Sequence, residues 1–238
     1  MPKSSKSYLL LMMGGSGTRF GADIPKQFIK VAGKPIFSYI LEKYDDCVSI
    51  DGAIVVCHAS WVEYTEKWIG GLNLRVHVDV VAGGASRSES VRNGLEAVAQ
   101  YAHDEDVILI HDATHPYVDE DRIPEVIEAT KKHGGATLGE CQYDTVYQMN
   151  AETHIIEGVI PRETVVSGAS PEAFLFGKVF PIYSNSTIEE LERYTSAGAL
   201  ALAYDIPMEV VPTNLINLKI TYRHDMEAFR KLFHNYYF

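Results

Sequence analysis

The stretch LLLMMGGSGTRFGADIPKQF, residues 9–28, joins a continuous apolar run to a loop that is rich in glycine. The run Tyr8–Met13 predicts a strand that is buried on both faces, as in a parallel sheet. Gly14, Gly15 and Gly17 have no Cβ, so backbone N–H groups of this loop are able to point into one concavity. A loop at the carboxyl end of a parallel strand is a usual position for a bound phosphate.

Two familiar phosphate-binding patterns do not match this loop. A dinucleotide fingerprint requires a third glycine where Phe20 stands, and a Walker loop requires a terminal Gly-Lys-Ser/Thr that is absent. A glycine-rich turn without a ligand is the alternative. Arg19 and Lys26, the latter held next to Pro25 and Gln27, favour an anion site, because both cations are able to reach the same phosphates.

Apolar runs alternate with helical patterns along the first 140 residues, which predicts a single α/β domain over residues 1–238. We expect a Rossmann-like, mainly parallel sheet with helices on both faces. The expected strands are Tyr8–Met13, Ala53–Cys57, Val76–Val81 and Val107–Ile110. The expected helices are Ile36–Tyr44, Val62–Ile69, Ser88–Tyr101 and Ile123–Lys132.

The pattern changes near residue 140. Residues 141–166 predict a protruding β-arm, with two short strands around the polar turn Asn150–Thr153. Such an arm serves either as a dimer contact or as a lid, and we favour the dimer contact. The remaining expected elements are helices Pro171–Phe180 and Thr187–Tyr204, strand Met208–Val211 and helix Asp225–Asn235.

The formal net charge of -11 argues against duplex DNA or an anionic membrane as a partner, although a local cationic pocket remains compatible with a small anion. The three cysteines, Cys47, Cys57 and Cys141, are far apart and form no zinc-binding spacing. Such sparse cysteines favour reduced thiols and a cytoplasmic location.

The segment GGSGTRFGADIPKQF resembles the nucleotide loop of the cytidylyltransferases that activate alditol phosphates, a family that includes methylerythritol 4-phosphate and ribitol-5-phosphate cytidylyltransferases. Further motifs follow in the family's order, so the resemblance covers almost the whole chain. These motifs are VAGGASRSESVRNGL (81–95), HDATHPYV (111–118), DTV (144–146), PR (161–162), SPEAF (170–174) and NLKIT (217–221).

The resemblance implies a CTP site and a Mg²⁺ ion held by Asp112, with His111 as support. A salt bridge at the start of a helix is the alternative role for Arg87, and a helix cap is the alternative for Ser88. The residues implied in nucleotide binding are Gly14, Gly15, Ser16, Gly17, Thr18, Gly83, Gly84, Arg87, Ser90 and Asp112.

The resemblance also implies that a polyol phosphate attacks the α-phosphorus of CTP and displaces pyrophosphate. Arg19, Lys26 and Lys219 are the implied catalytic cations. The implied acceptor-binding residues are Thr145, Arg162, Thr195 and His115. In the family, the arm that contains the first two of these positions reaches the site of the neighbouring subunit, so a homodimer is expected.

Three departures from the family's motifs lie on the acceptor side. His115 replaces an arginine, Glu172 replaces a glutamine, and Ser196 stands where an acid is expected. The PKQF loop (25–28) and the segment VVAGGASRSES (80–90) resemble the ribitol subgroup more closely, so we prefer ribitol 5-phosphate or a related polyol phosphate as acceptor, with methylerythritol 4-phosphate as the alternative. A nucleotide-binding module without turnover is a further hypothesis. An NAD-dependent oxidoreductase is disfavoured, because the second strand ends at Cys57 and His58 without an acid for the ribose.

Overall fold

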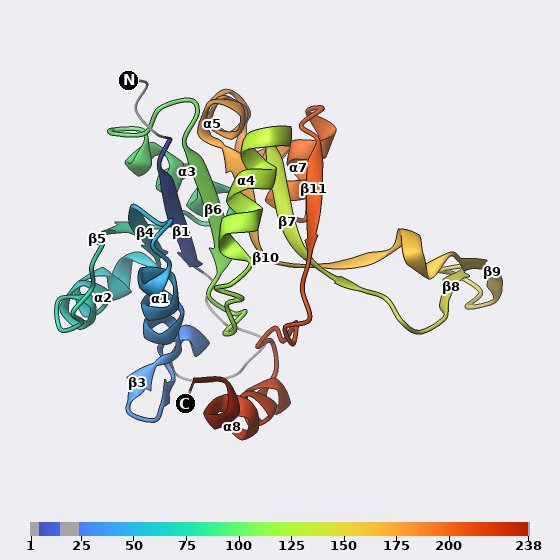
Figure 1. Ribbon diagram of the computed structural model, residues 1–238, viewed down its shortest axis with the longest axis horizontal. Coiled ribbons are helices and arrows are strands. Elements are labelled where there is room, and N and C mark those ends of the chain that lie inside the picture. The colour runs from blue at the N-terminus through green and yellow to red at the C-terminus, as the bar shows by residue number, and fades with distance from the viewer. Residues whose placement is uncertain (1–4, 15–23, 238) are drawn as a thin grey trace.

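The computed structural model describes residues 5–14 and 24–237 (Figure 1). Within this part of the chain, seven strands form a sheet in the order β11-β7-β10-β6-β1-β4-β5. Neighbouring strands are parallel except where β10 pairs with β6 and β7. The predicted mainly parallel α/β fold is confirmed. The strands are β1 (Ser7–Met13), β4 (Gly52–Cys57), β5 (His77–Ala82), β6 (Val107–Asp112), β7 (Gly135–Cys141), β10 (Val166–Leu175) and β11 (Met208–Pro212).

Helices cover both faces of this sheet. Successive side chains of β1 point to opposite faces, so alternate residues pack into two different cores. Leu9 and Leu11 pack with residues of α1, α4 and α8, whereas Leu10 packs with residues of α3, α5, α6 and α7. All seven residues of β1 are buried, as the continuous apolar run predicts. The helices of the described residues are α1 (Ile36–Asp46), α2 (Val62–Ile69), α3 (Arg87–Val98), α4 (Ile123–His133), α5 (Phe176–Asn185), α6 (Ile188–Leu191), α7 (Ala197–Ala203) and α8 (Arg223–Tyr237).

The predicted helix Pro171–Phe180 is wrong over its first half. Residues up to Leu175 belong to β10, and α5 begins at Phe176. Residues up to Leu175 form a strand despite their helix-compatible spacing, because β10 lies between β6 and β7 and hydrogen bonds to both. The single helix predicted over Thr187–Tyr204 is also wrong, since α6 and α7 are separate and Ser196 caps the second.

Two other local features differ from the expectations. Strand β7 was not predicted, because its sequence GATLGEC has no apolar run; its pairing with β10 and β11 makes it a strand. The cap of α3 is Ser86, whose side chain accepts the N–H of Glu89, so the cap expected at Ser88 lies two residues too late.

The hairpin expected after residue 140 is present as β8 (Val146–Met149) and β9 (Ile156–Ile160). These strands pair only with each other among the described strands, and Figure 1 shows the hairpin far from the body of the molecule. A short pair, β2 (Lys30–Val31) and β3 (Lys34–Pro35), precedes α1. No helix in residues 5–14 or 24–237 has the length and apolar character needed to cross a membrane.

Candidate active site

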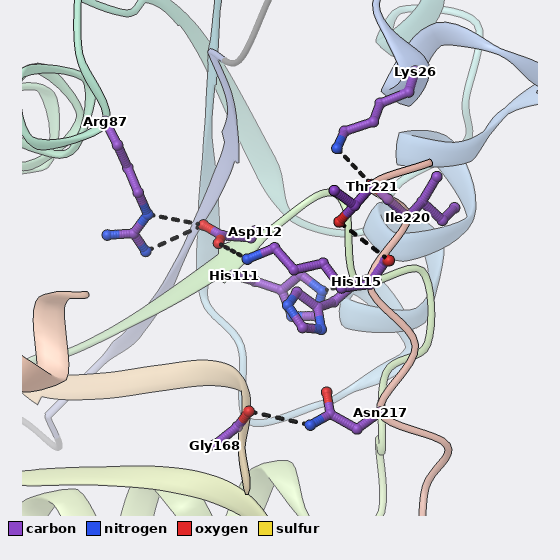
Figure 2. A network of polar contacts seen from close by, with 10 residues as sticks. Lys26, Arg87, His111, Asp112, His115, Gly168, Asn217, Ile220 and Thr221 are labelled. Atoms are coloured by element: carbon purple, nitrogen blue, oxygen red, sulfur yellow. Dashed lines mark hydrogen bonds and ion pairs between the residues drawn. The ribbon is translucent and has the colours of Figure 1, made fainter. Parts of the chain in front are cut away.

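Asp112, the last residue of β6, lies between two cations (Figure 2). Its Oδ1 accepts hydrogen bonds from Nη2 and Nε of Arg87 at 3.2 and 3.3 Å, and its Oδ2 lies 3.4 Å from Nζ of Lys219. Burial of the carboxyl group opposes its ionisation, but Arg87 and Lys219 outweigh this effect and lower the pKa of Asp112 below its usual value. The carboxylate is therefore charged at neutral pH.

The sheet register places Asp112 near Gly14, the residue that follows β1. Met12 of β1 is the register partner of Asp112, so Gly14 follows two residues beyond that pairing at the same carboxyl edge. Arg87 reaches this edge because it is the first residue of α3. The predicted cluster at the carboxyl ends of the parallel strands is the arrangement in which open α/β sheets bind ligands.

Lys26 and Gln27, which follow the glycine loop in sequence, are held by two backbone carbonyls. Nζ of Lys26 donates to the carbonyl of Ile220 at 2.5 Å, beside the segment that contains Lys219 (Figure 2). Nε2 of the buried Gln27 donates to the carbonyl of Met13, also at 2.5 Å. These bonds bring Lys26 to the end of β1. The predicted residues Gly15, Ser16, Gly17, Thr18 and Arg19 lie outside the described residues.

Ser90 lies against both glycine segments. Its hydroxyl donates to the carbonyl of Ser86 at 2.8 Å and accepts the N–H of Gly84 at 3.1 Å. A Cβ placed on Gly14 or Gly83 would approach the Ser90 oxygen to 2.9 or 2.7 Å, so neither position tolerates a side chain without movement. The predicted pyrimidine contact of Ser90 remains a prediction, and the observed role of its hydroxyl is to shape the turn.

Beneath Asp112, the fully buried His111 links two elements. Its Nε2 lies 2.8 Å from the carbonyl of His115, and its Nδ1 lies 3.0 Å from the hydroxyl of Tyr44. Because a carbonyl only accepts, Nε2 bears the proton and Nδ1 accepts from Tyr44. Burial lowers the pKa of His111 to about 4, so the imidazole is neutral near pH 7.

His115 differs in charge from the arginine expected at its position. Burial, followed by repulsion from His111 and Lys219, lowers the pKa of His115 to about 4. Its imidazole is therefore neutral at physiological pH and supplies no fixed positive charge to an acceptor phosphate.

A pocket of about 350 Å³ lies next to Arg87, between the start of α3 and the turn from α6 to α7. Most of its side chains bear hydroxyl groups, and the predicted acceptor residue Thr195 is among them. The lining residues are Ser86, Arg87, Ser88, Tyr183, Leu191, Glu192, Tyr194, Thr195 and Ser196.

The departures Glu172 and Ser196 meet at the start of α7. Oγ of Ser196 accepts the N–H of Ala199 at 3.0 Å, and Oε1 of Glu172 accepts the N–H of Gly198 at 3.1 Å. Serine and aspartate are equivalent helix caps, so Ser196 keeps the capping role of an acid at this position. The Glu172 carboxylate is held by the helix. Burial opposes the charge of Arg87, but Asp112 and then Glu172 outweigh it and raise the pKa of Arg87 above its ordinary value.

Thr145 and Arg162 are not brought to Asp112 within this chain. Both lie on the segments that connect the hairpin to the sheet, and the Arg162 guanidinium donates to the carbonyl of Tyr143. Sequence reasoning also missed the role of Asn217, whose amide donates to the carbonyl of Gly168 at 3.2 Å and which faces His115 (Figure 2). Its presence in the NLKIT motif was the available signal.

A side-chain cluster that encloses a metal ion is not present in the described part of the chain, because no three His, Cys, Asp or Glu side chains converge there. Asp112 offers a carboxylate at the site. A single carboxylate fits Mg²⁺, which is usually bound by one or two carboxylates, substrate phosphates and waters.

Comparisons with known proteins show the family and the fold of this chain. A 2-C-methyl-D-erythritol 4-phosphate cytidylyltransferase of Petrotoga mobilis is 31% identical over 226 residues, which cover 95% of this chain and 97% of the relative. A ribitol-5-phosphate cytidylyltransferase of Streptococcus agalactiae is 30% identical over 225 residues, 94% of each protein. The crystal structure of 4-diphosphocytidyl-2C-methyl-D-erythritol synthase from Anaerococcus prevotii has the same fold, with a TM-score of 0.80 at 20% identity over 97% of this chain and 99% of that chain.

The resemblance to the alditol-phosphate cytidylyltransferases is thus confirmed, and with it the prediction of a CTP-dependent cytidylyltransferase. Relatives named for either of the two expected acceptors match the chain about equally well. A family model described as "IspD: 2-C-methyl-D-erythritol 4-phosphate cytidylyltransferase" matches residues 8–232, and the chain belongs to this family.

Proposed function

We propose that this chain transfers CMP from CTP to a polyol phosphate and releases pyrophosphate, with ribitol 5-phosphate as the preferred acceptor. 2-C-methyl-D-erythritol 4-phosphate is the alternative acceptor. The main support is the position of Asp112 between Arg87 and Lys219, at the strand edge where Lys26 and Gly14 also lie.

The reaction needs no nucleophile from the protein. An oxygen of the acceptor phosphate attacks the α-phosphorus of CTP and forms a new P–O bond. The bond from the α-phosphorus to the oxygen that bridges it to the β-phosphorus breaks, and pyrophosphate leaves with the electron pair. Catalysis then consists of placing both phosphates and neutralising the charge on the α-phosphoryl oxygens, which is the proposed role of Lys26, Lys219 and Arg19.

We propose that Asp112 holds Mg²⁺ together with the nucleotide phosphates. When bound, the ion supplies positive charge to phosphate oxygens and orients them. Arg87 and Lys219 occupy the carboxylate oxygens of Asp112 in this structure, and both cations are also suited to phosphate. When Mg²⁺ and the nucleotide bind, Asp112 would exchange its two cations for the metal ion. Arg87 and Lys219 would exchange the carboxylate for phosphate oxygens.

The lining of the 350 Å³ pocket supports a polyol acceptor. Ser86, Ser88, Thr195 and Ser196 bring hydroxyl groups that donate and accept hydrogen bonds with an alditol. Ribitol 5-phosphate has one more hydroxyl than methylerythritol 4-phosphate and lacks its methyl branch, so it matches this polar lining better. The neutral His115 favours an acceptor phosphate bound elsewhere, which supports a role for Arg162 from a second subunit.

A homodimer is part of this proposal. The hairpin β8–β9 exposes apolar side chains on both strands, and an isolated two-stranded hairpin is at best marginally stable in water. Thr145 and Arg162 flank this hairpin, so an arm that packs on a second copy would bring them to the partner's site. The exposed apolar residues of the arm are Tyr143, Tyr147, Met149, Ile155, Ile156 and Val159.

The test is pyrophosphate release from CTP with a panel of polyol phosphates, with Mg²⁺ and with a chelator. We expect turnover that requires the metal and a higher kcat/KM for ribitol 5-phosphate than for methylerythritol 4-phosphate. The reverse ratio would favour the alternative acceptor. If none of the acceptors in the panel supports pyrophosphate release, the proposal is contradicted and the chain is a nucleotide-binding module without turnover.

A further inference from the structure

The loop that follows Asp112 is held from outside by the final helix. Residues Ala113–Val118 connect β6 to the rest of the chain, and His115 lies within them. Four of their carbonyl groups accept hydrogen bonds from other elements, so little of the loop's shape depends on its own backbone. The donors to the carbonyls of residues 114, 115, 116 and 118 are Ile220 N, His111 Nε2, Tyr237 OH and Tyr236 OH.

The two tyrosines at the end of α8 supply the contacts at the far end of this loop. The hydroxyl of Tyr237 donates to the carbonyl of Pro116. The hydroxyl of Tyr236 donates to the carbonyl of Val118 and accepts its N–H at 2.8 Å. Pro116 has no N–H of its own, so its carbonyl is the only backbone group through which this residue is hydrogen bonded.

Aromatic packing sets the direction of both hydroxyls. The buried Tyr117 packs edge to face with Tyr236 at a centroid distance of 4.5 Å, and Tyr237 packs with Tyr39 at 5.0 Å. The rings alone would keep α8 docked, because the buried Phe229 packs with Tyr117 and the buried Phe233 packs with Tyr39 of α1. The hydroxyl groups are therefore not needed to dock the helix, and their contacts act on the loop.

We propose that Tyr236 and Tyr237 are positioning residues, whose hydroxyl groups hold the loop Ala113–Val118 and thereby set His115 beside Asp112 on the acceptor side of the site. This inference rests on the proposed function, because it assigns the loop to binding of the acceptor. The nucleotide side has separate supports: Ser90 shapes the turn at Gly84, and Gln27, next to Lys26, donates to the carbonyl of Met13.

The test compares the variants Tyr236→Phe, Tyr237→Phe and the double variant with Tyr39→Phe. Phenylalanine keeps each ring and removes only the hydroxyl. Tyr39 is the matched control, since it packs in the same aromatic cluster but its hydroxyl donates to the carbonyl of Val31 at 2.7 Å, away from the loop.

In the double variant we expect the KM for the acceptor to rise about tenfold, the size of an ordinary hydrogen bond lost. The KM for CTP should change less than about twofold on the same reasoning, because the supports on the nucleotide side remain. Amide exchange at Val118, the N–H that Tyr236 accepts, should accelerate about tenfold in the double variant and in Tyr236→Phe, but not in Tyr39→Phe.

Equal kinetics and equal Val118 exchange in the double variant and in Tyr39→Phe would overturn the inference. A parallel rise in both KM values would overturn it as well, because that result indicates general destabilisation. If the wild-type enzyme turns over no acceptor, the proposed function fails. Val118 exchange then decides the loop contact by itself: acceleration confined to the Tyr236 variants supports it, and no acceleration contradicts it.

Discussion

The parallel half of the sheet and the arm β8–β9 differ in how they complete their packing. In β1 every side chain is buried by strands on both sides and helices on both faces. In the arm, by contrast, Tyr147 and Val159 are register partners, and their side chains are 55% and 63% exposed. The parallel half forms a complete core within one chain, whereas the arm has apolar surface that only another surface is able to cover.

The largest effect is expected at the catalytic edge of the parallel half. Lys26→Ala should reduce turnover on the order of 100-fold or more, because it removes a charge proposed to stabilise the α-phosphoryl oxygens. Pyrophosphate release from CTP measures this effect. Lys30→Ala is the control, since Lys30 is an exposed lysine over the Trp68 ring, and near-normal turnover is expected. Similar turnover in the two variants would contradict the assignment of Lys26.

The second prediction concerns self-association through the arm. The double variant Tyr147→Asp and Val159→Asp should weaken self-association on the order of 100-fold, because it places charges in the proposed contact. Sedimentation measures the dissociation constant, and thermal unfolding should be unchanged at a concentration at which both proteins are monomeric. Val48→Asp is the control, since Val48 is 89% exposed and lies before β4, away from the arm. A monomeric wild-type protein would contradict the proposed dimer.

Acidification is expected to weaken the buried half and not the arm. The folded pKa of His111 is about 4, below its ordinary value of 6.5. Between these values the unfolded chain binds a proton that the folded chain excludes, so the free energy of unfolding falls as pH decreases from 6.5 to 4. His111 contributes a loss of about 1.4 kcal/mol per pH unit, which vanishes above pH 6.5. His115, whose folded pKa is also about 4, contributes in the same direction over the same range.

Urea unfolding over this pH range measures that loss. His154→Gln, in the exposed turn of the arm, should leave the pH profile unchanged. His111→Gln should reduce its slope by about half, because His115, whose pKa is also about 4, keeps its contribution. A wild-type stability that is flat from pH 6.5 to 4 would contradict a neutral, buried His111.

The smallest expected effect is on stability, in a comparison of one glycine that packs on the parallel half of the sheet with one glycine in the arm. A Cβ on Gly94 in α3 would approach the Leu10 side chain to 2.3 Å and the Val56 side chain to 2.8 Å. Gly94→Ala should therefore destabilise the protein by about 1 kcal/mol, after overpacking is partly offset by the better helix propensity of alanine. Gly158→Ala, in β9, meets nothing within 4 Å and should change stability by less than about 0.5 kcal/mol. Chemical denaturation measures both, and equal effects would contradict the contrast between the regions.

The elements that were predicted correctly are those whose patterns are local. The apolar run of β1 and the alternation up to α4 contain enough periodicity to predict strands and helices. The strands β7 and β10 were missed because GATLGEC lacks an apolar run and SPEAF has helix-compatible spacing. Their mutual pairing, from Gly135–Phe174 to Cys141–Val166, makes them strands.

The candidate site divides in the same way. Asp112 at the end of a buried strand and the bare backbone near Gly14 and Gly83 follow from the sequence alone, since both depend on short segments. The ion pairs of Asp112 with Arg87 and Lys219 join residues 25 and 107 positions apart, and the Val118 contact with Tyr236 spans 118 positions. Only the tertiary structure decides such contacts, because they depend on how separate strands and helices pack against one another. No local sequence pattern specifies which of many cations or tyrosines will be the partner.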